Sequence, residues 1–264
     1  ACNAIPKILL EQFSKISNIY FLIIAFFQMI KEFSNSNGKP VILFPLFIVV
    51  SVNGIKDFYE DWKRKKSDDE ENSKKVLIWI KIENIHQRNF INKQWRDVLI
   101  GDIIKIKENE YFPADCLLLN TSEKSNCCYI ETKSIDGETN LKFKKSNKDI
   151  LEIYPDPKNK NKLIIFDGCK IYCPPPNEFI YQFDGKFIPN SKICNNNPKI
   201  NQKKDSIFLD IDNFILRGCS LKQTAYAYAI VVYVGHDTKI MRNSCKAKEK
   251  VSKIEHIMNK QIII

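Results

Sequence analysis

Five consecutive residues carry side chains that could do chemistry: an acid, a glycine, a second acid, a hydroxyl and an amide. They lie within SIDGETNLK, residues 134–142, and are Asp136, Gly137, Glu138, Thr139 and Asn140. Glycine permits a tight or left-handed backbone, which would leave Glu138 at the tip of a loop. A glutamate in that position could orient a water molecule and take its proton.

The same residues are also typical of an ordinary polar turn, in which Asp and Asn side chains hydrogen-bond to the nearby backbone. The sequence shows no histidine, metal site or second acid arranged around Glu138. Glu138 alone cannot form a complete hydrolytic site. Spacing by itself therefore favours a turn over a catalytic loop.

A strand must position this loop, because the segment CCYIET, residues 127–132, directly precedes it and has the apolar and aromatic content of a strand. Similar short runs, separated by polar turns, predict a mainly β body. The runs are 76–83, 97–107, 115–120, 162–173, 179–188 and 214–235. Asp-Gly turns are expected within 162–173 and 179–188.

The Asn- and Lys-rich stretch 185–206 is weakly patterned and offers little to bury. It predicts a surface loop that can be deleted without loss of folding. After Gly235 the pattern becomes helical.

Two apolar runs near the start of the chain, 19–30 and 40–52, are each shorter than the ~20 residues that span a bilayer. With their helical flanks both reach that length. A signal peptide is the alternative for the first run, but a second apolar run follows in place of a cleavage site. A transmembrane hairpin is favoured, and the basic cluster at 63–66 places both of its ends in the cytosol.

Two uncharged polar residues, Gln28 and Asn53, lie within these helices. At membrane depth such side chains face other helices or a transport pathway, whereas near the interface water solvates them. Both alternatives stay open for Gln28 and Asn53, which are candidates for a lipid pathway in the first case.

Charge and cysteine content argue against two other classes of protein. The 264 residues carry a formal net charge of +10, but the lysines are scattered through polar loops and form no basic stripe interleaved with aromatics. We therefore expect no nucleic-acid partner. The nine cysteines include no C-x-x-C pair and the three histidines stand apart, so we expect no metal site and reduced, packed thiols.

The loop DGETNLK after a strand resembles the signature loop of the actuator domain of P-type ATPases, in the form typical of the type IV class, the phospholipid flippases. Further segments along the whole chain resemble the same class. They are LLEQFSKISNIYFLIIAFFQ, IKDFYEDWKRKKSD, QWRDVLIGDIIKI, FPADCLLL, PPPNEFIYQFDG, LRGCSLKQT and VVYVGHDTKIMRNS. The chain departs from the family pattern at Lys65, Ile135, Ala229 and in the segment PKILL, none of which touches Asp-Gly-Glu-Thr.

The resemblance implies a mixed fold, with a transmembrane helical hairpin and a mainly β cytosolic actuator domain of a distorted β-roll or jelly-roll type. Residues 1–66 would form the hairpin, with helices at about 10–34 and 40–62. Residues 67–235 would form the actuator domain. Residues 236–264 would form a linker and the start of a third membrane helix.

The resemblance also assigns roles within the loop. Glu138 would position the water that attacks an aspartyl phosphate on another domain, while Asp136, Gly137 and Thr139 would shape the loop. Rotation of the actuator would pull linkers at about 67–75 and 236–250, and so alternate the access of a lipid headgroup.

The complete protein would be a multi-pass membrane protein with its actuator domain in the cytosol. It would use ATP and Mg²⁺, take a phospholipid as substrate, and have phosphorylation and nucleotide-binding domains as partners of this chain. An accessory flippase β-subunit is left open as a further partner. Because the chain has neither a phosphorylation motif nor a nucleotide-binding domain, we expect it to bind no cofactor and to be inactive alone.

Two alternatives come from other classes of protein. Large protozoan guanylyl cyclases carry a flippase-like regulatory module, which would have no transport activity of its own. A phosphorylation motif or a cyclase domain further along the parent gene would separate these two readings. A membrane-anchored β-domain that only binds partners accounts for the hairpin but not for the run of family segments.

Overall fold

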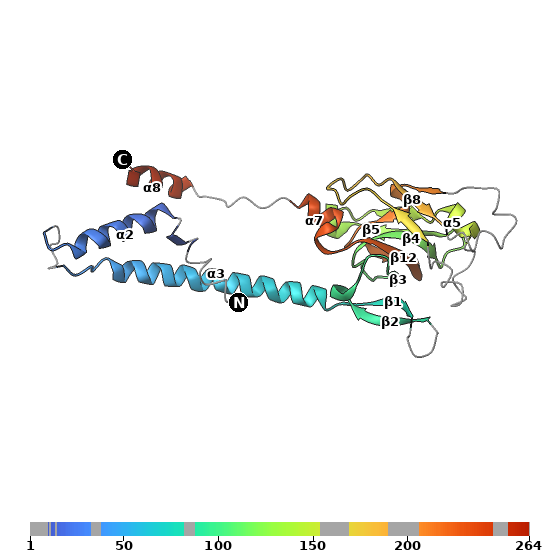
Figure 1. The fold of residues 1–264 in the computed structure, drawn as a ribbon, viewed down its shortest axis with the longest axis horizontal. Coiled ribbons are helices and arrows are strands. Elements are labelled where there is room, and N and C mark those ends of the chain that lie inside the picture. The colour runs from blue at the N-terminus through green and yellow to red at the C-terminus, as the bar shows by residue number, and fades with distance from the viewer. Residues whose placement is uncertain are drawn as a thin grey trace. The chain divides into compact units, whose positions relative to one another are not determined.

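A computed structural model describes residues 10, 12–13, 15–32, 38–81, 88–153, 169–189, 206–244 and 253–263. The chain divides into two compact units, one formed by Ala1–Glu71 with Ala247–Ile264 and the other by Asn72–Lys246. Helices make up most of the described part of the first, the helical unit, and strands are the main elements of the second, the β unit (Figure 1). The units divide after the boundaries expected at 66 and 235.

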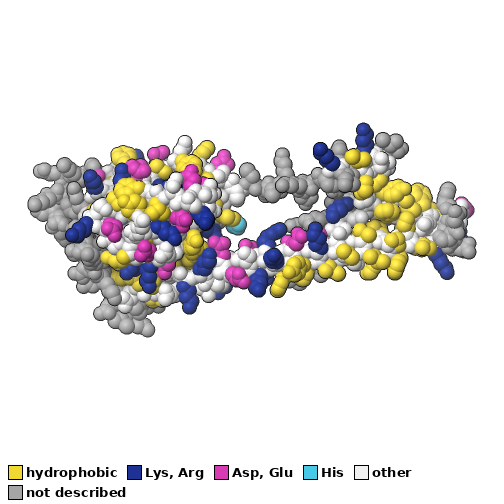
Figure 2. All heavy atoms as spheres, turned by 180° about the vertical axis from the view of Figure 1, so that it is seen from behind, with side chains coloured by type: hydrophobic (Ala, Val, Ile, Leu, Met, Phe, Trp, Pro, Cys, Tyr) yellow, Lys and Arg dark blue, Asp and Glu magenta, His cyan; other side chains and the backbone are white. Residues whose placement is uncertain are grey.

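The helical unit contains α2 (Ile16–Met29), α3 (Leu43–Asn72) and α8 (Lys253–Ile263), and α2 and α8 lie against each other. Many apolar side chains of α2 and α3 are exposed, among them Phe44 and Phe47 at 72% and 71%. Figure 2 shows apolar side chains gathered on the visible face of this unit. The unit therefore presents an unusually apolar surface.

Helices form at both expected positions of the hairpin, but with different bounds. α2 ends at Met29, and α3 continues through the basic cluster to Asn72. Ion pairs one turn apart, such as Lys56–Glu60 and Arg64–Asp61, support this charged half of α3. Among the described helices, none combines the length and the apolar character that crossing a bilayer requires.

Three antiparallel sheets build the β unit. A six-stranded sheet has the order β10-β4-β12-β3-β1-β2, and two three-stranded sheets have the orders β11-β5-β6 and β7-β8-β9. The strands are β1 (Lys75–Lys81), β2 (Arg88–Gln94), β3 (Ile103–Lys107), β4 (Asp115–Thr121), β5 (Cys127–Glu131), β6 (Leu141–Lys145), β7 (Lys170–Tyr172), β8 (Gly185–Ile188), β9 (Ile207–Leu209), β10 (Phe214–Ile215), β11 (Ser220–Lys222) and β12 (Tyr226–Tyr233). Short helices follow β5, β6 and β12: α4 (Lys133–Asp136), α5 (Lys148–Ile153) and α7 (Lys239–Asn243). The predicted mainly β body is confirmed.

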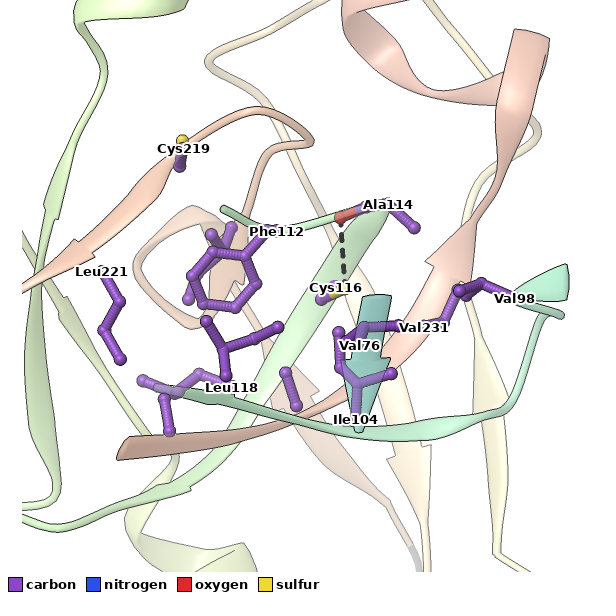
Figure 3. Packing of buried hydrophobic residues seen from close by; sticks show 14 of the residues in the cluster. Val76, Val98, Ile104, Phe112, Ala114, Cys116, Leu118, Cys219, Leu221 and Val231 are labelled. Atoms are coloured by element: carbon purple, nitrogen blue, oxygen red, sulfur yellow. Dashed lines mark hydrogen bonds between the residues drawn. The ribbon is translucent and has the colours of Figure 1, made fainter. Parts of the chain in front are cut away.

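The six-stranded sheet is buried on both faces, which explains the apolar runs in its central strands. One face packs against β5 and β11 in a core (Figure 3) that includes Ile104, Cys116, Leu118, Cys128 and Leu221. The other face packs against β8 and β9 in a second core that includes Leu117, Phe187, Ile207, Phe214 and Val232. Alternate residues of one strand thus enter opposite cores, as Leu117 and Leu118 of β4 do.

Three of the cysteines that were predicted to pack as small hydrophobes lie in the first core. Cys116, Cys128 and Cys219 are free and fully buried. Burial raises the pKa of Cys128 and of Cys219 to about 12. These side chains therefore stay protonated and pack as small hydrophobes.

Three strands were missed by the sequence prediction: β2, β6 and β9. Each lies at the edge of its sheet, with a partner strand on one side. An edge strand leaves much of its surface in solvent, so it tolerates the Asn, Gln and Lys residues that fill β2 and β6. Such strands lack the apolar runs by which the central strands were found.

The expected Asp-Gly turn within 179–188 is wrong. Gly185 is the first residue of β8 rather than part of a turn, and its φ is not positive. A Cβ atom at this position would lie 2.8 Å from the ring of Phe183. The glycine therefore allows close packing instead of a chain reversal.

The loop expected over 185–206 is also wrong at its start, because β8 occupies the first four of these residues and Phe187 is buried in the second core. A deletion that began at 185 would remove this strand. Residues 190–205 lie outside the described residues, as does the part of the predicted strand 162–173 that precedes Cys169.

Candidate functional site

A hairpin of β5 and β6 carries the loop 134–142. The two strands pair from Cys127 opposite Lys145 to Glu131 opposite Leu141. This register brings Thr132, which follows β5, and Lys142, near the start of β6, to the two sides of the base of the loop. The single helical turn α4 then connects the end of β5 to the glycine of the loop.

Asp136 organises the backbone of the loop. Its two carboxylate oxygens lie 2.9 and 3.0 Å from the hydroxyl of Thr132, and Oδ1 also accepts the backbone N–H of Glu138 at 3.0 Å. Gly137, between the two acids, has φ +76°, in the left-handed region that favours glycine. The polar turn that spacing favoured is therefore present, and it leads directly to Glu138.

Lys142 joins the two acids of the loop. Its Nζ lies 2.5 Å from Asp136 Oδ2 and 3.1 Å from Glu138 Oε2. The hydrogen bond from Lys142 lowers the pKa of Asp136 to about 2, and the same bond raises the pKa of Lys142. The expectation that no second acid stands near Glu138 is wrong, because Asp136 shares the ammonium group of Lys142 with it.

Glu138 and Thr139 form the exposed tip of the loop. The side chain of Glu138 is 58% exposed, compared with 18% for Asp136. The carboxylate of Glu138 is thus open to a group presented from outside the β unit. Within the described ranges, no cluster of three His, Cys, Asp or Glu side chains could hold a metal ion.

A second contact ties the base of the loop to the turn before β11. The hydroxyl of Ser134 donates to the backbone carbonyl of Gly218 at 2.6 Å.

A cavity of about 50 Å³ lies behind the loop, lined in part by Thr132, Asp136 and Lys142. This volume holds about one or two water molecules, and no substrate.

Comparisons with known proteins agree with the resemblance of the loop. The family model of the phospholipid-translocating ATPase N-terminal region matches residues 1–42. Phospholipid-transporting ATPase tat-1 of Caenorhabditis elegans is 37% identical over 98% of this chain and 20% of its own length. Phospholipid-transporting ATPase IC of Homo sapiens is 36% identical over 98% of this chain and 19% of its own length. Phospholipid-transporting ATPase DRS2 of Saccharomyces cerevisiae is 34% identical over 98% of this chain and 17% of its own length.

Over nearly all of its length, the chain is similar to phospholipid-translocating ATPases. It spans about a fifth of the length of the curated relatives it matches, and the family model places its start in their N-terminal region. These relatives are phospholipid-transporting ATPases by name, so they give no support to the alternative of a cyclase-associated module.

The two polar residues predicted for the hairpin helices lie in different surroundings. Gln28 is half-buried, and its Oε1 accepts the backbone N–H of Ile42 at 3.3 Å, just before α3. Asn53 is half-buried within α3. An apolar groove of about 740 Å³ in the same unit is lined by α2 and α3 side chains such as Leu22 and Val50, but by neither Gln28 nor Asn53.

The sequence reasoning missed two residues that contact Asp136 at the base of the loop: Thr132 and Lys142. Lys142 stands four residues after Glu138, a spacing that indicates an ion pair, and this signal could have been used. Thr132 gave no signal, because a threonine at the end of a strand is ordinary.

Proposed function

We propose that the chain is the N-terminal portion of an ATP-dependent phospholipid translocase, and that its loop 134–142 assists hydrolysis of an aspartyl phosphate on another domain. The exposed carboxylate of Glu138, on a backbone held by Asp136 and Gly137, carries this proposal. The loop supplies one carboxylate at an accessible tip. The phosphate and the rest of the site must therefore come from another domain.

The chemical step needs one base. Glu138 accepts a proton from a water molecule whose oxygen attacks the phosphorus atom. The bond between phosphorus and the aspartyl oxygen breaks, which releases inorganic phosphate and regenerates the aspartate. Asp136 and Gly137 fix the direction of the loop, and Thr139 shapes its tip beside Glu138.

Transport would require the parts of the complete protein that lie outside this chain. ATP and Mg²⁺ would act on its phosphorylation and nucleotide-binding domains, and a phospholipid would be the substrate. An accessory flippase β-subunit would be a further partner. Rotation of the actuator domain, residues 67–235, would move the membrane helices through the linkers at about 67–75 and 236–250. The first of these linkers is helical up to Asn72.

Residues 1–66 would form a transmembrane hairpin, and 236–264 a linker and the start of a third membrane helix, with the actuator domain in the cytosol. The exposed apolar side chains of α2 and α3 support this assignment. Gln28 and Asn53 would then face the lipid pathway. Extraction of membranes with alkaline carbonate tests it: we expect the expressed chain to stay in the pellet, and release into the supernatant would contradict a membrane-spanning hairpin.

The substitution Glu138→Gln in the complete protein tests the role of the loop. Gln keeps the shape and the hydrogen-bonding capacity of the side chain but removes the base. We expect phosphorylation by labelled ATP to proceed and hydrolysis of the phosphoenzyme to slow by ~10²–10⁴. The acid-stable phosphoenzyme should then accumulate while steady-state turnover is lost.

Glu123→Gln is a matched control, because Glu123 is an exposed glutamate in the turn at the other end of β5. It should leave both the phosphoenzyme level and the turnover unchanged. If Glu138→Gln behaves like this control in an active parent, then the loop is not the dephosphorylation element.

A further inference from the structure

We infer that Lys142 is a positioning residue for dephosphorylation, whose ammonium group holds the carboxylates of Asp136 and Glu138 together so that Glu138 is presented in a fixed direction. This inference rests on the proposed function of the loop. It assigns a role to a residue that would not itself touch the phosphate or the attacking water.

The contacts of Lys142 are those of a clamp rather than of a solvated surface lysine. Its ammonium group lies within 3.1 Å of an oxygen of each acid, and it is 5.9 Å from the centre of the Tyr181 ring. Its side chain is 32% exposed, well below the 58% of Glu138. One cation therefore bridges an inner acid that shapes the backbone and an outer acid at the tip.

The backbone of Lys142 is fixed independently of the loop. Lys142 pairs with Ile130 of β5, and Ile130 is buried in the first core. The clamp thus starts from a paired strand. Without it, the carboxylate of Glu138 would lose its contact with Lys142, and only the backbone of Glu138 would be held, by its hydrogen bond to Asp136.

The positive charge of Lys142 also offsets the negative charge of the two carboxylates. Two carboxylates two positions apart repel each other, and both would repel an approaching phosphoryl group. The ammonium group leaves the cluster with one net negative charge instead of two, which reduces both repulsions.

The other charged groups around the loop have partners of their own or lie outside the cluster. Glu131 of β5 pairs with Lys222 of β11 at 3.6 Å. On β6, Lys144 donates to the carbonyl of Ile211, and Lys145 pairs with Asp212. The remaining charged side chains on the adjoining elements are those of Lys133 in α4 and Arg217 in the turn before β11. Among the described residues, none of these groups forms an ion pair with Glu138.

The test uses the complete protein, with Lys142→Met to remove the charge, Lys142→Arg to keep it, and Lys145→Met as the control. Lys145 forms its ion pair with Asp212 from the same strand, at 3.0 Å, outside the loop. Labelled phosphoenzyme is formed and its decay is followed after a chase with unlabelled ATP. Formation of phosphoenzyme by each variant shows that the variant is folded.

We expect Lys142→Met to slow the decay about tenfold to hundredfold, because the base is no longer held in place. Lys142→Arg should restore the rate in large part because it keeps the cation, and Lys145→Met should leave the rate unchanged.

Two results would overturn the inference while leaving the proposed function intact. The first is normal decay of Lys142→Met where Glu138→Gln still traps the phosphoenzyme. The second is a slower decay of Lys142→Met that Lys142→Arg does not rescue, which is the signature of a merely structural lysine. Failure of Glu138→Gln to trap the phosphoenzyme would instead overturn the proposed function, and the inference with it.

Discussion

Asp115 and Asp136 both accept hydrogen bonds from backbone N–H groups of the β unit. Asp115 is buried in the core, whereas Asp136 lies in the loop 134–142. Asp115, at the start of β4, accepts the N–H groups of Arg217 and Lys239 at 2.8 and 2.7 Å and is fully buried. Asp136 accepts the N–H group of Glu138 and is within reach of Lys142 and of water.

The pKa values of the two acids move in opposite directions. Burial raises the pKa of Asp115 to about 6, although its hydrogen bonds act to lower it. The hydrogen bond from Lys142 lowers the pKa of Asp136 to about 2. The same side chain thus serves two purposes. In the core it joins β4, the turn before β11 and the start of α7, whereas in the loop it shapes an accessible backbone without sealing it from solvent.

The largest effect should come from breaking the buried site. Asp115→Ala leaves the N–H groups of Arg217 and Lys239 without an acceptor in the core, and we expect a loss of about 3 kcal/mol in the free energy of unfolding. Asp136→Ala, the control in the loop, should cost less than about 1 kcal/mol because solvent replaces its contacts. Denaturant unfolding of the two variants measures both values, and equal losses would contradict the comparison.

The pH dependence of stability should sharpen the comparison between Asp115 and Asp136. Because the folded-state pKa of Asp115 is raised from 3.8 to about 6, the native state binds more protons than the unfolded state between these values. The contribution of this group is therefore highest below pH 4 and falls, by up to about 3 kcal/mol, as the pH rises through 6. Asp115→Asn should remove this slope from the unfolding free energy, and an unchanged slope would show that another group causes it.

A smaller effect is expected from the glycine of the loop. At φ +76° a non-glycine residue is strained, yet a Cβ atom on Gly137 would meet no atom within 4 Å. Gly137→Ala should therefore cost only about 1 kcal/mol of unfolding free energy, from backbone conformation alone. Gly137→Asn should cost less, because Asn tolerates this region better. A loss of several kcal/mol in thermal unfolding would mean that the loop is packed rather than free.

The smallest effect should come from the ion pair of the loop. The lowered pKa of Asp136 means that its stabilising contribution is present above pH 4 and is lost as the pH falls toward 2. Asp136→Asn should lower stability slightly at neutral pH and low salt, and molar salt should abolish the difference. A difference that persists in high salt would place Asp136 in an environment as shielded as that of Asp115.

The sequence by itself determined the β character of the β unit, the positions of its central strands and the family resemblance of the loop. Strands such as β4 and β12 are buried on both faces, so their apolar runs are read directly from the sequence. The turn at Asp136–Gly137 was equally local, since its hydrogen bonds join residues two to four positions apart.

Only the tertiary structure decided the rest. The edge strands β2, β6 and β9 form because a central strand offers them a partner, and the need for glycine at Gly185 arises from the ring of Phe183. Asp115 meets Lys239 across 124 positions of the sequence. No local pattern encodes such a contact, because its energy depends on burial and on atoms that only the packed sheets bring together. The clamp of Lys142 lies between these limits: its spacing is local, but its direction depends on the pairing of β5 with β6.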